Sequence, residues 1–247
     1  MESRYYKSYS SNLNREMEYK VYGYSGKLAF AFPPQNGRFY DFENFHMTDA
    51  ISSYIENGKL LLVTPDGIDG ESFSASGDGR TRIEKQEAYF RYITLELLPL
   101  VKVEYGCQGK ALATGCSMGG YHSANFFFRR PDLFDTVISL SGLYEATFFF
   151  GSYMDNLVYD NSPSIFLRNM SEDHPYMSLY RKSNIILCTG QGAWEEDMIK
   201  STRNMEAVLK EKNIPAWVDY WGYDVNHDWP WWQKQLPYFL SSIRELN

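Results

Sequence analysis

The sequence has no excess of positive charge and contains little histidine. Its 247 residues include 24 Lys and Arg, 31 Asp and Glu and 4 His, which gives a formal net charge of −7. A protein that binds nucleic acid needs a basic face to neutralise phosphates, and no stretch of this chain concentrates Lys and Arg. The composition therefore predicts no nucleic-acid partner.

Long apolar runs and paired cysteines are also missing. No stretch approaches the roughly 20 apolar residues that a membrane-spanning helix needs. The polar, tyrosine-rich segment 1–20 lacks the apolar core of a signal peptide. The 3 cysteines are an odd number for a disulfide framework, and none forms a Cys-x-x-Cys pair. We therefore expect reduced thiols, no membrane association and a cytoplasmic location.

Apolar and aromatic residues are plentiful by contrast. Apolar residues make up 44% of the chain and charged residues 22%, so the chain can bury a core. The aromatic fraction is 17%, and all 6 tryptophans lie in the C-terminal quarter, at Trp194, Trp217, Trp221, Trp229, Trp231 and Trp232.

Short apolar runs alternate along the chain with longer segments of helical periodicity. This alternation predicts a mostly parallel sheet flanked by helices, in a single α/β domain over residues 1–247. The expected strands are 27–32, 60–64, 111–114, 136–140, 185–189 and 216–220. The expected helices are 48–56, 84–98 with Pro99 as the stop, 118–129, 196–212 and 229–244. Residues 67–82 are predicted to form a long surface loop, and residues 141–183 a small cap or insertion over the sheet.

The sharpest local motif is the run G-C-S-M-G-G over residues 115–120, between an expected strand and an expected helix. This is a G-x-S-x-G pattern in the strand-turn-helix context of a nucleophile elbow. Small residues are needed there because flanking side chains would collide with the neighbouring strand and helix. We therefore predict that Ser117 is a nucleophile and that the backbone N–H of Met118 faces the developing oxyanion.

A serine nucleophile needs a base, and the chain offers four histidines. His227 follows the last expected strand and precedes the last expected helix, where the histidine of this architecture belongs in chain order. His46 and His174 suit surface or loop roles, and His122 suits a packing or hydrogen-bonding role beneath the elbow. We therefore predict that His227 is the base.

The acid that orients the imidazole is expected in the loop after strand 185–189. That loop carries three adjacent carboxylates. Asp197 suits the first turn of the next helix, where an acidic side chain favours the helix dipole. Glu195 is nearest the strand end and is preferred, and Glu196 stays open as the second choice.

These motifs resemble the putative-esterase family of the α/β-hydrolase superfamily, which includes S-formylglutathione hydrolases, feruloyl esterases and mycolyltransferases. The resemblance runs over about residues 27–240 and rests on G-R-F-Y at 37–40, the elbow followed by Y-H at 121–122, P-D-L-F at 131–134 and N-H-D-W at 226–229. It implies a serine hydrolase that acts on an ester, with Ser117 as nucleophile and His227 as base.

The chain departs from this family at two places. Many relatives have an aspartate as the acid, whereas this loop offers a glutamate, as in mycolyltransferases. Many relatives also supply a second oxyanion donor from a His-Gly loop, whereas this chain has F-P-P-Q-N-G at 32–37. Because proline has no N–H to donate, Gln35 or Asn36 would have to serve, and Gln35 is the assigned donor.

The function expected from these residues is hydrolysis of a small-molecule carboxylic ester through a Ser-His-Glu triad and an acyl-enzyme. This chemistry requires no metal and no cofactor. An acyltransferase with the same triad and a non-catalytic binding protein on the same fold are the alternatives. The sequence does not indicate the oligomeric state.

The tryptophans flank the predicted acid and base. Large side chains that pack the end of the sheet are the preferred interpretation of this skew. An aromatic wall around the catalytic loops, suited to an apolar or aromatic ester group, is the alternative.

Overall fold

A computed structural model describes residues 1–246 and places eight strands in one sheet. Their order across the sheet is β1-β2-β4-β3-β5-β6-β7-β8. Strands β1, β2 and β4 pair antiparallel, and all the later pairings are parallel. The strands are β1 Ser3–Ser10, β2 Arg15–Tyr22, β3 Lys27–Phe32, β4 Leu60–Pro65, β5 Ala111–Cys116, β6 Phe134–Leu140, β7 Asn184–Thr189 and β8 Trp217–Tyr220.

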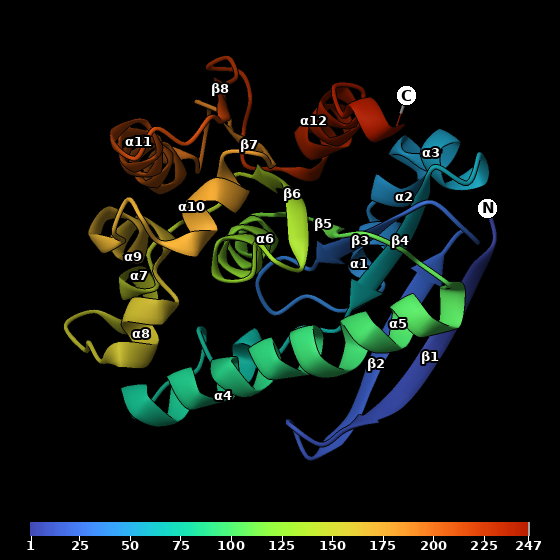
Figure 1. The fold of residues 1–247 in the computed structure, drawn as a ribbon, viewed down its shortest axis with the longest axis horizontal. Helices are drawn as coiled ribbons and strands as arrows, with labels where there is room; N and C mark the ends of the chain where they lie inside the picture. Colours follow the sequence, from blue (N-terminus) through green and yellow to red (C-terminus); the bar gives the residue numbers. More distant parts are fainter. Residues whose placement is uncertain (247) are drawn as a thin grey trace.

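Helices cover both faces of the sheet (Figure 1). Helices α4 to α6 and α9 to α11 pack on one face, and α1 to α3 with α12 pack on the other. Their bounds are α1 Asp41–Asn44, α2 Met47–Ala50, α3 Ser52–Glu56, α4 Gly79–Arg91, α5 Leu98–Tyr105, α6 Met118–Arg129, α7 Thr147–Phe150, α8 Asn156–Asp160, α9 Pro163–Asn169, α10 Pro175–Tyr180, α11 Glu196–Glu211 and α12 Trp229–Leu240. None of the helices within residues 1–246 is both long and apolar enough to cross a bilayer.

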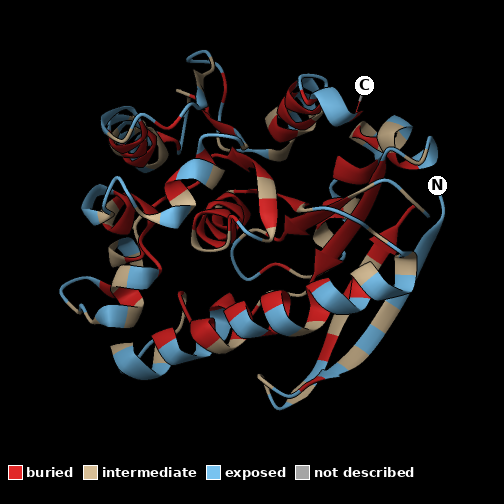
Figure 2. Ribbon diagram, viewed as in Figure 1, coloured by how far each residue is buried: buried red, intermediate tan, exposed pale blue. Residues whose placement is uncertain are grey.

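The two faces follow from the alternation of side chains along each strand. In β3, Leu28, Phe30 and Phe32 enter the larger core, whereas Ala29 and Ala31 enter the smaller core under α12. Both sets are buried, so the central strands have continuous apolar runs, as expected of a parallel sheet covered on both sides. Figure 2 shows these strands buried and the outer sides of the helices exposed.

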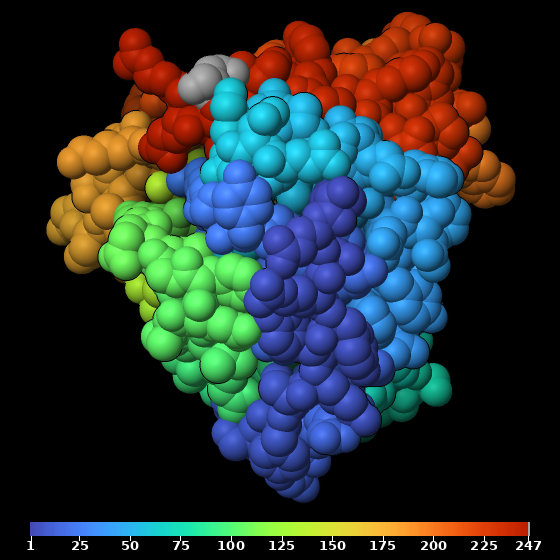
Figure 3. Space-filling view, turned by 90° about the vertical axis from the view of Figure 1, so that its right-hand side faces the viewer, coloured from blue at the N-terminus to red at the C-terminus, as the bar shows by residue number. Residues whose placement is uncertain are grey.

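The strands predicted from apolar runs are all present, and β3 has the predicted bounds. Two further strands, β1 and β2, occupy the N-terminal segment for which no strand was predicted. They form an antiparallel hairpin at the edge of the sheet, where Tyr6 donates a hydrogen bond to Glu104 of α5 at 2.7 Å. Figure 3 shows this hairpin in dark blue against the green surface of α5.

The prediction that Pro99 ends a helix is wrong. Helix α4 continues through a π-helical turn, Tyr92–Leu97, directly into α5, and Figure 1 shows a single rod. A proline inside a regular helix lacks an N–H and clashes with the carbonyl four residues earlier. The wider π turn changes the spacing of the carbonyls just before Pro99, so the chain passes the proline and remains helical.

Residues 141–183 lie between β6 and β7 and carry four short helices, α7 to α10. Together with Phe73 and Ile83, the apolar side chains of α7 and α8 pack on the first turn of α6, where Met118 and Tyr121 are buried. The segment therefore lies against the helix that begins at the elbow.

The three cysteines differ in burial, which leads to a prediction about their reactivity. Cys116 and Cys188 are buried in the core under α12, and burial raises the pKa of both thiols well above the usual range. Cys107 is partly exposed, and burial raises its pKa less.

Because the thiolate is the reactive form, we expect a disulfide reagent at pH 8 to titrate about one thiol per native chain, slowly. All three should react after denaturation in guanidinium chloride. Rapid reaction of two or more thiols in the native protein would contradict the burial described above.

Candidate active site

The elbow between β5 and α6 holds Ser117 in a backbone conformation that is rare outside glycine. Its φ is 57° and its ψ is −121°. The conformation is stabilised by a hydrogen bond from the Ser117 N–H to the carbonyl of Leu140 at 2.8 Å. Strain of this kind persists when the surroundings fix it, and it is concentrated at functional sites.

The glycines of the elbow are required by close backbone approaches. A Cβ on Gly115 would lie 2.5 Å from the backbone of Gly119, and a Cβ on Gly119 would lie 2.2 Å from the carbonyl oxygen of Phe32. Neither distance is tolerable for a side chain, so the G-x-S-x-G pattern has a steric cause at both positions.

His227 lies directly beside the elbow serine. Its Nε2 is 2.8 Å from Oγ of Ser117, although the two residues are 110 positions apart. The backbone N–H of His227 donates to the carbonyl of Ala193 at 3.0 Å, which fixes the loop after β8 to the loop after β7. The other loop histidines lie elsewhere: His46 pairs with an aspartate on the surface, and His174 caps α10.

Glu195 is fully buried on the far side of the imidazole. Its Oε2 lies 3.3 Å from Nδ1 of His227, an ion-pair distance. Within residues 1–246 this nitrogen has no hydrogen-bond partner with good alignment. Glu196 is the first residue of α11 and is exposed, so Glu195 is the carboxylate of this loop that lies at the histidine.

The predicted oxyanion donors lie at the same place. Met118 begins α6, where backbone N–H groups are free of helical partners. Gln35 lines the pocket beside Ser117, and its side-chain amide donates to Ser74 at 2.7 Å. Of the two residues that the sequence left open, Gln35 is the one that lines the pocket.

The pocket at Ser117 has a volume of about 400 Å³. Its walls are mostly apolar and come from the elbow with the first turn of α6, the loop before α11 with the first turn of α11, and the segment 141–183. They include Met118, Tyr121, Leu143, Phe148, Phe149, Trp194 and Met198. A more open hollow of about 490 Å³ lies at the far end of α6, but it contains none of the residues of the elbow.

The tryptophans divide between the two roles considered for them. Trp194 lines the pocket with a φ of 69° and 79% of its surface exposed. Trp232 packs edge-on against His227, with ring centroids 5.0 Å apart. Trp217 and Trp221 pack against Phe239 of α12, in the packing role at the end of the sheet.

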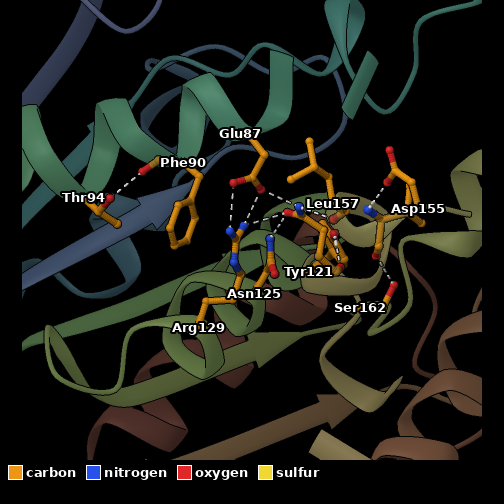
Figure 4. Close-up of polar contacts among 11 residues, drawn as sticks. Glu87, Phe90, Thr94, Tyr121, Asn125, Arg129, Asp155, Leu157 and Ser162 are labelled. Carbon is orange, nitrogen blue, oxygen red and sulfur yellow. Dashed lines mark hydrogen bonds and ion pairs between the residues drawn. The ribbon is translucent and has the colours of Figure 1, made fainter. Parts of the chain in front are cut away.

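A largely buried network of polar side chains connects helices α4 and α6 with the segment 141–183 (Figure 4). Arg129 of α6 makes a bidentate ion pair with Glu87 of α4, at 2.7 and 2.9 Å. Asn161, in the segment 141–183, donates to Glu87 at 2.6 Å and accepts from Arg129 at 3.1 Å. The hydroxyl of Tyr121 donates to the carbonyl of Asn161 at 2.6 Å, which joins the network to a residue that lines the pocket.

Beneath the elbow, His122 forms a buried pair with Asp69. Its Nε2 lies 2.8 Å from Oδ1 of Asp69, and the side chains are 3% and 1% exposed. The aromatic rings of Phe32, Phe73, Tyr89 and Tyr121 surround the imidazole. The hydrogen-bonding role expected for His122 is therefore present, and its partner comes from the loop that also carries Ser74.

Replacing Asp69 by alanine is expected to lower the free energy of unfolding by about 3 kcal/mol, because a buried group would lose its partner. The matched control is Glu71→Ala, which removes a partly exposed pair with Arg15 and should cost less than about 1 kcal/mol. Urea denaturation of both variants measures the difference. Equal losses would show that the buried pair stabilises the fold no more than the partly exposed pair does.

Two residues at or beneath the site, Asp69 and Ser141, were missed in the sequence. Trp232 was predicted to lie near the base, but its contacts were not predicted. Ser141 follows directly after β6, and the carboxyl ends of parallel strands meet at one edge of the sheet. The position of Ser141 after a predicted strand was therefore a signal in the sequence that this residue lies near the site. Asp69 and Trp232 lack a comparable motif, because their contacts depend on packing between distant segments.

Several solved structures share the fold of this chain. The chain has the fold of a ferulic acid esterase at a TM-score of 0.78 and 18% identity, covering 100% of this chain and 98% of that one. It is also similar to S-formylglutathione hydrolase from Staphylococcus aureus, at a TM-score of 0.75 and 14% identity over 100% and 99% of the two chains. A third similar structure is MPT51 of Mycobacterium tuberculosis, at 0.72 and 15% identity over 98% of each chain.

No curated protein sequence matches the chain. The sequence profile of the family described as "Putative esterase" matches residues 10–242, nearly the whole chain. The predicted fold class and the predicted family are thus both confirmed. The chain belongs to the putative esterase family and has its α/β-hydrolase fold.

Proposed function

We propose that this member of the esterase family hydrolyses small carboxylic esters through an acyl-enzyme on Ser117. The observation that carries the proposal is the contact of Ser117 Oγ with His227 Nε2 at 2.8 Å, with the buried Glu195 behind the imidazole. A serine hydroxyl is a weak nucleophile until an adjacent base takes its proton, and this geometry provides that base.

The reaction proceeds in two halves. His227 takes the proton of Ser117 as Oγ attacks the ester carbonyl, and the N–H of Met118 stabilises the oxyanion together with a donor at Gln35. His227 then returns the proton to the leaving alcohol. In the second half, His227 activates a water molecule that releases the acid and restores Ser117. Glu195 fixes the tautomer of the imidazole and stabilises its charged form.

The shape of the pocket limits the substrate. A volume of about 400 Å³ with apolar walls suits a small ester in which the group nearest Ser117 is apolar. We propose that the segment 141–183 acts as a cap, because Leu143, Phe148 and Phe149 from it line the pocket. The described residues, 1–246, then form a single domain with this insertion.

A panel of p-nitrophenyl esters of increasing acyl length, extended with aromatic acyl groups, tests the proposal. We expect hydrolysis well above the buffer rate, with a preference that reflects the apolar walls. Product analysis with added alcohol separates a hydrolase, which releases the free acid, from an acyltransferase, which forms a new ester. Failure of the folded protein to hydrolyse or transfer any acyl group would contradict the proposal and favour a binding role.

A further inference from the structure

We propose that Ser141 and Trp232 are positioning residues, which fix the orientation of the proposed acid, Glu195, relative to the proposed base, His227. The proposal rests on the function proposed above and concerns how its geometry is maintained. The hydroxyl of Ser141 donates to Oε1 of Glu195 at 2.5 Å, and it accepts a hydrogen bond from Nε1 of Trp232 at 3.0 Å. All three side chains are buried.

The backbone at Ser141 is built to present its hydroxyl at this point. Ser141 follows β6 directly, and its N–H donates to the carbonyl of Cys188 on β7 at 2.7 Å. Its φ is 51°, a value that favours glycine. A serine at such a position carries backbone strain, and the hydroxyl is the group that glycine would lack.

Trp232 contacts the proposed base and the serine that holds the proposed acid. Its indole N–H reaches Ser141, and its ring packs against the imidazole of His227 at 5.0 Å with an interplanar angle of 88°. One rigid side chain on α12 therefore limits the rotation of the base and fixes the group that holds the acid.

The direction of these hydrogen bonds determines how the carboxylate of Glu195 is held toward His227. An ionised carboxylate only accepts, and an indole N–H only donates, so the single proton of Ser141 must point to Glu195. With Oε1 fixed by Ser141 and Oε2 bonded by Thr189 at 3.0 Å, the carboxylate cannot turn away from Nδ1 of His227. The positive charge that His227 acquires during the reaction then meets a fixed partner.

The first test is Ser141→Gly, which removes the hydroxyl and suits the positive φ. Loss of a hydrogen bond to a charged group predicts a fall in kcat of about 10- to 100-fold. KM should stay within about twofold, because the hydroxyl of Ser141 is bonded to Glu195 and Trp232, although the residue lines the pocket. The melting temperature should fall only modestly, because glycine relieves the strain of the positive φ and so offsets part of the cost of the lost hydrogen bonds. A wild-type kcat in the folded variant would overturn the proposal, and so would a rise in KM at unchanged kcat, which would assign Ser141 to substrate binding.

The second test is a double-mutant cycle with Trp232→Phe, which keeps a ring beside His227 and removes the N–H. If the two residues act through one chain of hydrogen bonds, the double variant should lose little more kcat than Ser141→Gly alone. Trp221→Phe is the control, since its indole bonds to Asp219 and packs at the sheet end. Additive losses in kcat would show that Ser141 and Trp232 act independently, which would overturn the proposed chain of hydrogen bonds.

These results are distinguishable from failure of the proposed function. Should Ser117→Ala keep full esterase activity, the proposed function fails whatever happens at Ser141. Should Ser117→Ala be inactive while Ser141→Gly keeps the kcat of the wild type, only the positioning role fails.

Discussion

Replacing Ser117 by alanine is expected to lower kcat/KM for an ester substrate by about 10⁵- to 10⁶-fold, because no acyl-enzyme can form without the hydroxyl. The oxyanion donors and the pocket would remain and would leave a small residual rate over water. Steady-state kinetics on the best ester of the substrate panel gives the measurement.

Two controls separate this loss from unfolding. Alanine carries the same backbone strain at φ 57° as serine, so the melting temperature should change little. Ser123→Ala, in helix α6 directly after the elbow, removes a buried hydroxyl that donates to the carbonyl of Gly120. It should retain activity close to that of the wild type. If the Ser117→Ala protein kept more than a tenth of wild-type activity, this result would exclude Ser117 as the nucleophile.

Glu195→Gln is expected to have the second largest effect, a loss of about 10³- to 10⁴-fold in kcat. The amide has the same shape, but it lacks the charge that stabilises the imidazolium and can donate where the carboxylate only accepts. The imidazole then loses both its preferred tautomer and its partner.

Glu196→Gln is the matched control for this variant. Glu196 is adjacent in the sequence but exposed at the start of α11, so its effect on kcat should stay within about twofold. Kinetics of the two variants with one ester assigns the acid. If Glu196→Gln were the inactive variant, the geometry described for Glu195 would not be the one that operates.

The parts of the site that the sequence could predict are those that depend on local rules. The elbow is a short motif whose glycines have steric causes, and the family places the histidine after the last strand. The candidate acid was narrowed to Glu195 and Glu196 because both follow a recognisable strand. Burial then distinguishes Glu195 from Glu196. Burial depends on the tertiary fold, and the local sequence does not determine which of two adjacent glutamates is buried.

The parts that the sequence did not reveal depend on distant contacts. Strand β2 alternates charged and apolar residues, with Met17, Tyr19 and Val21 buried, and this period of two was a usable signal. Strand β1 is largely exposed and has a weaker pattern. The passage of a helix through Pro99 and the contact of Trp232 with Ser141 arise only when segments far apart in the chain pack together.

The central claim is that Ser117 is an activated nucleophile, and a fluorophosphonate probe, which reacts with the activated serine of serine hydrolases, tests it most directly. We expect the native wild type to incorporate one probe per chain, with the modified peptide mapping to Ser117, and we expect Ser117→Ala to stay unlabelled while folded. Labelling of the alanine variant at the wild-type rate, or no labelling of the folded wild type, would contradict the account.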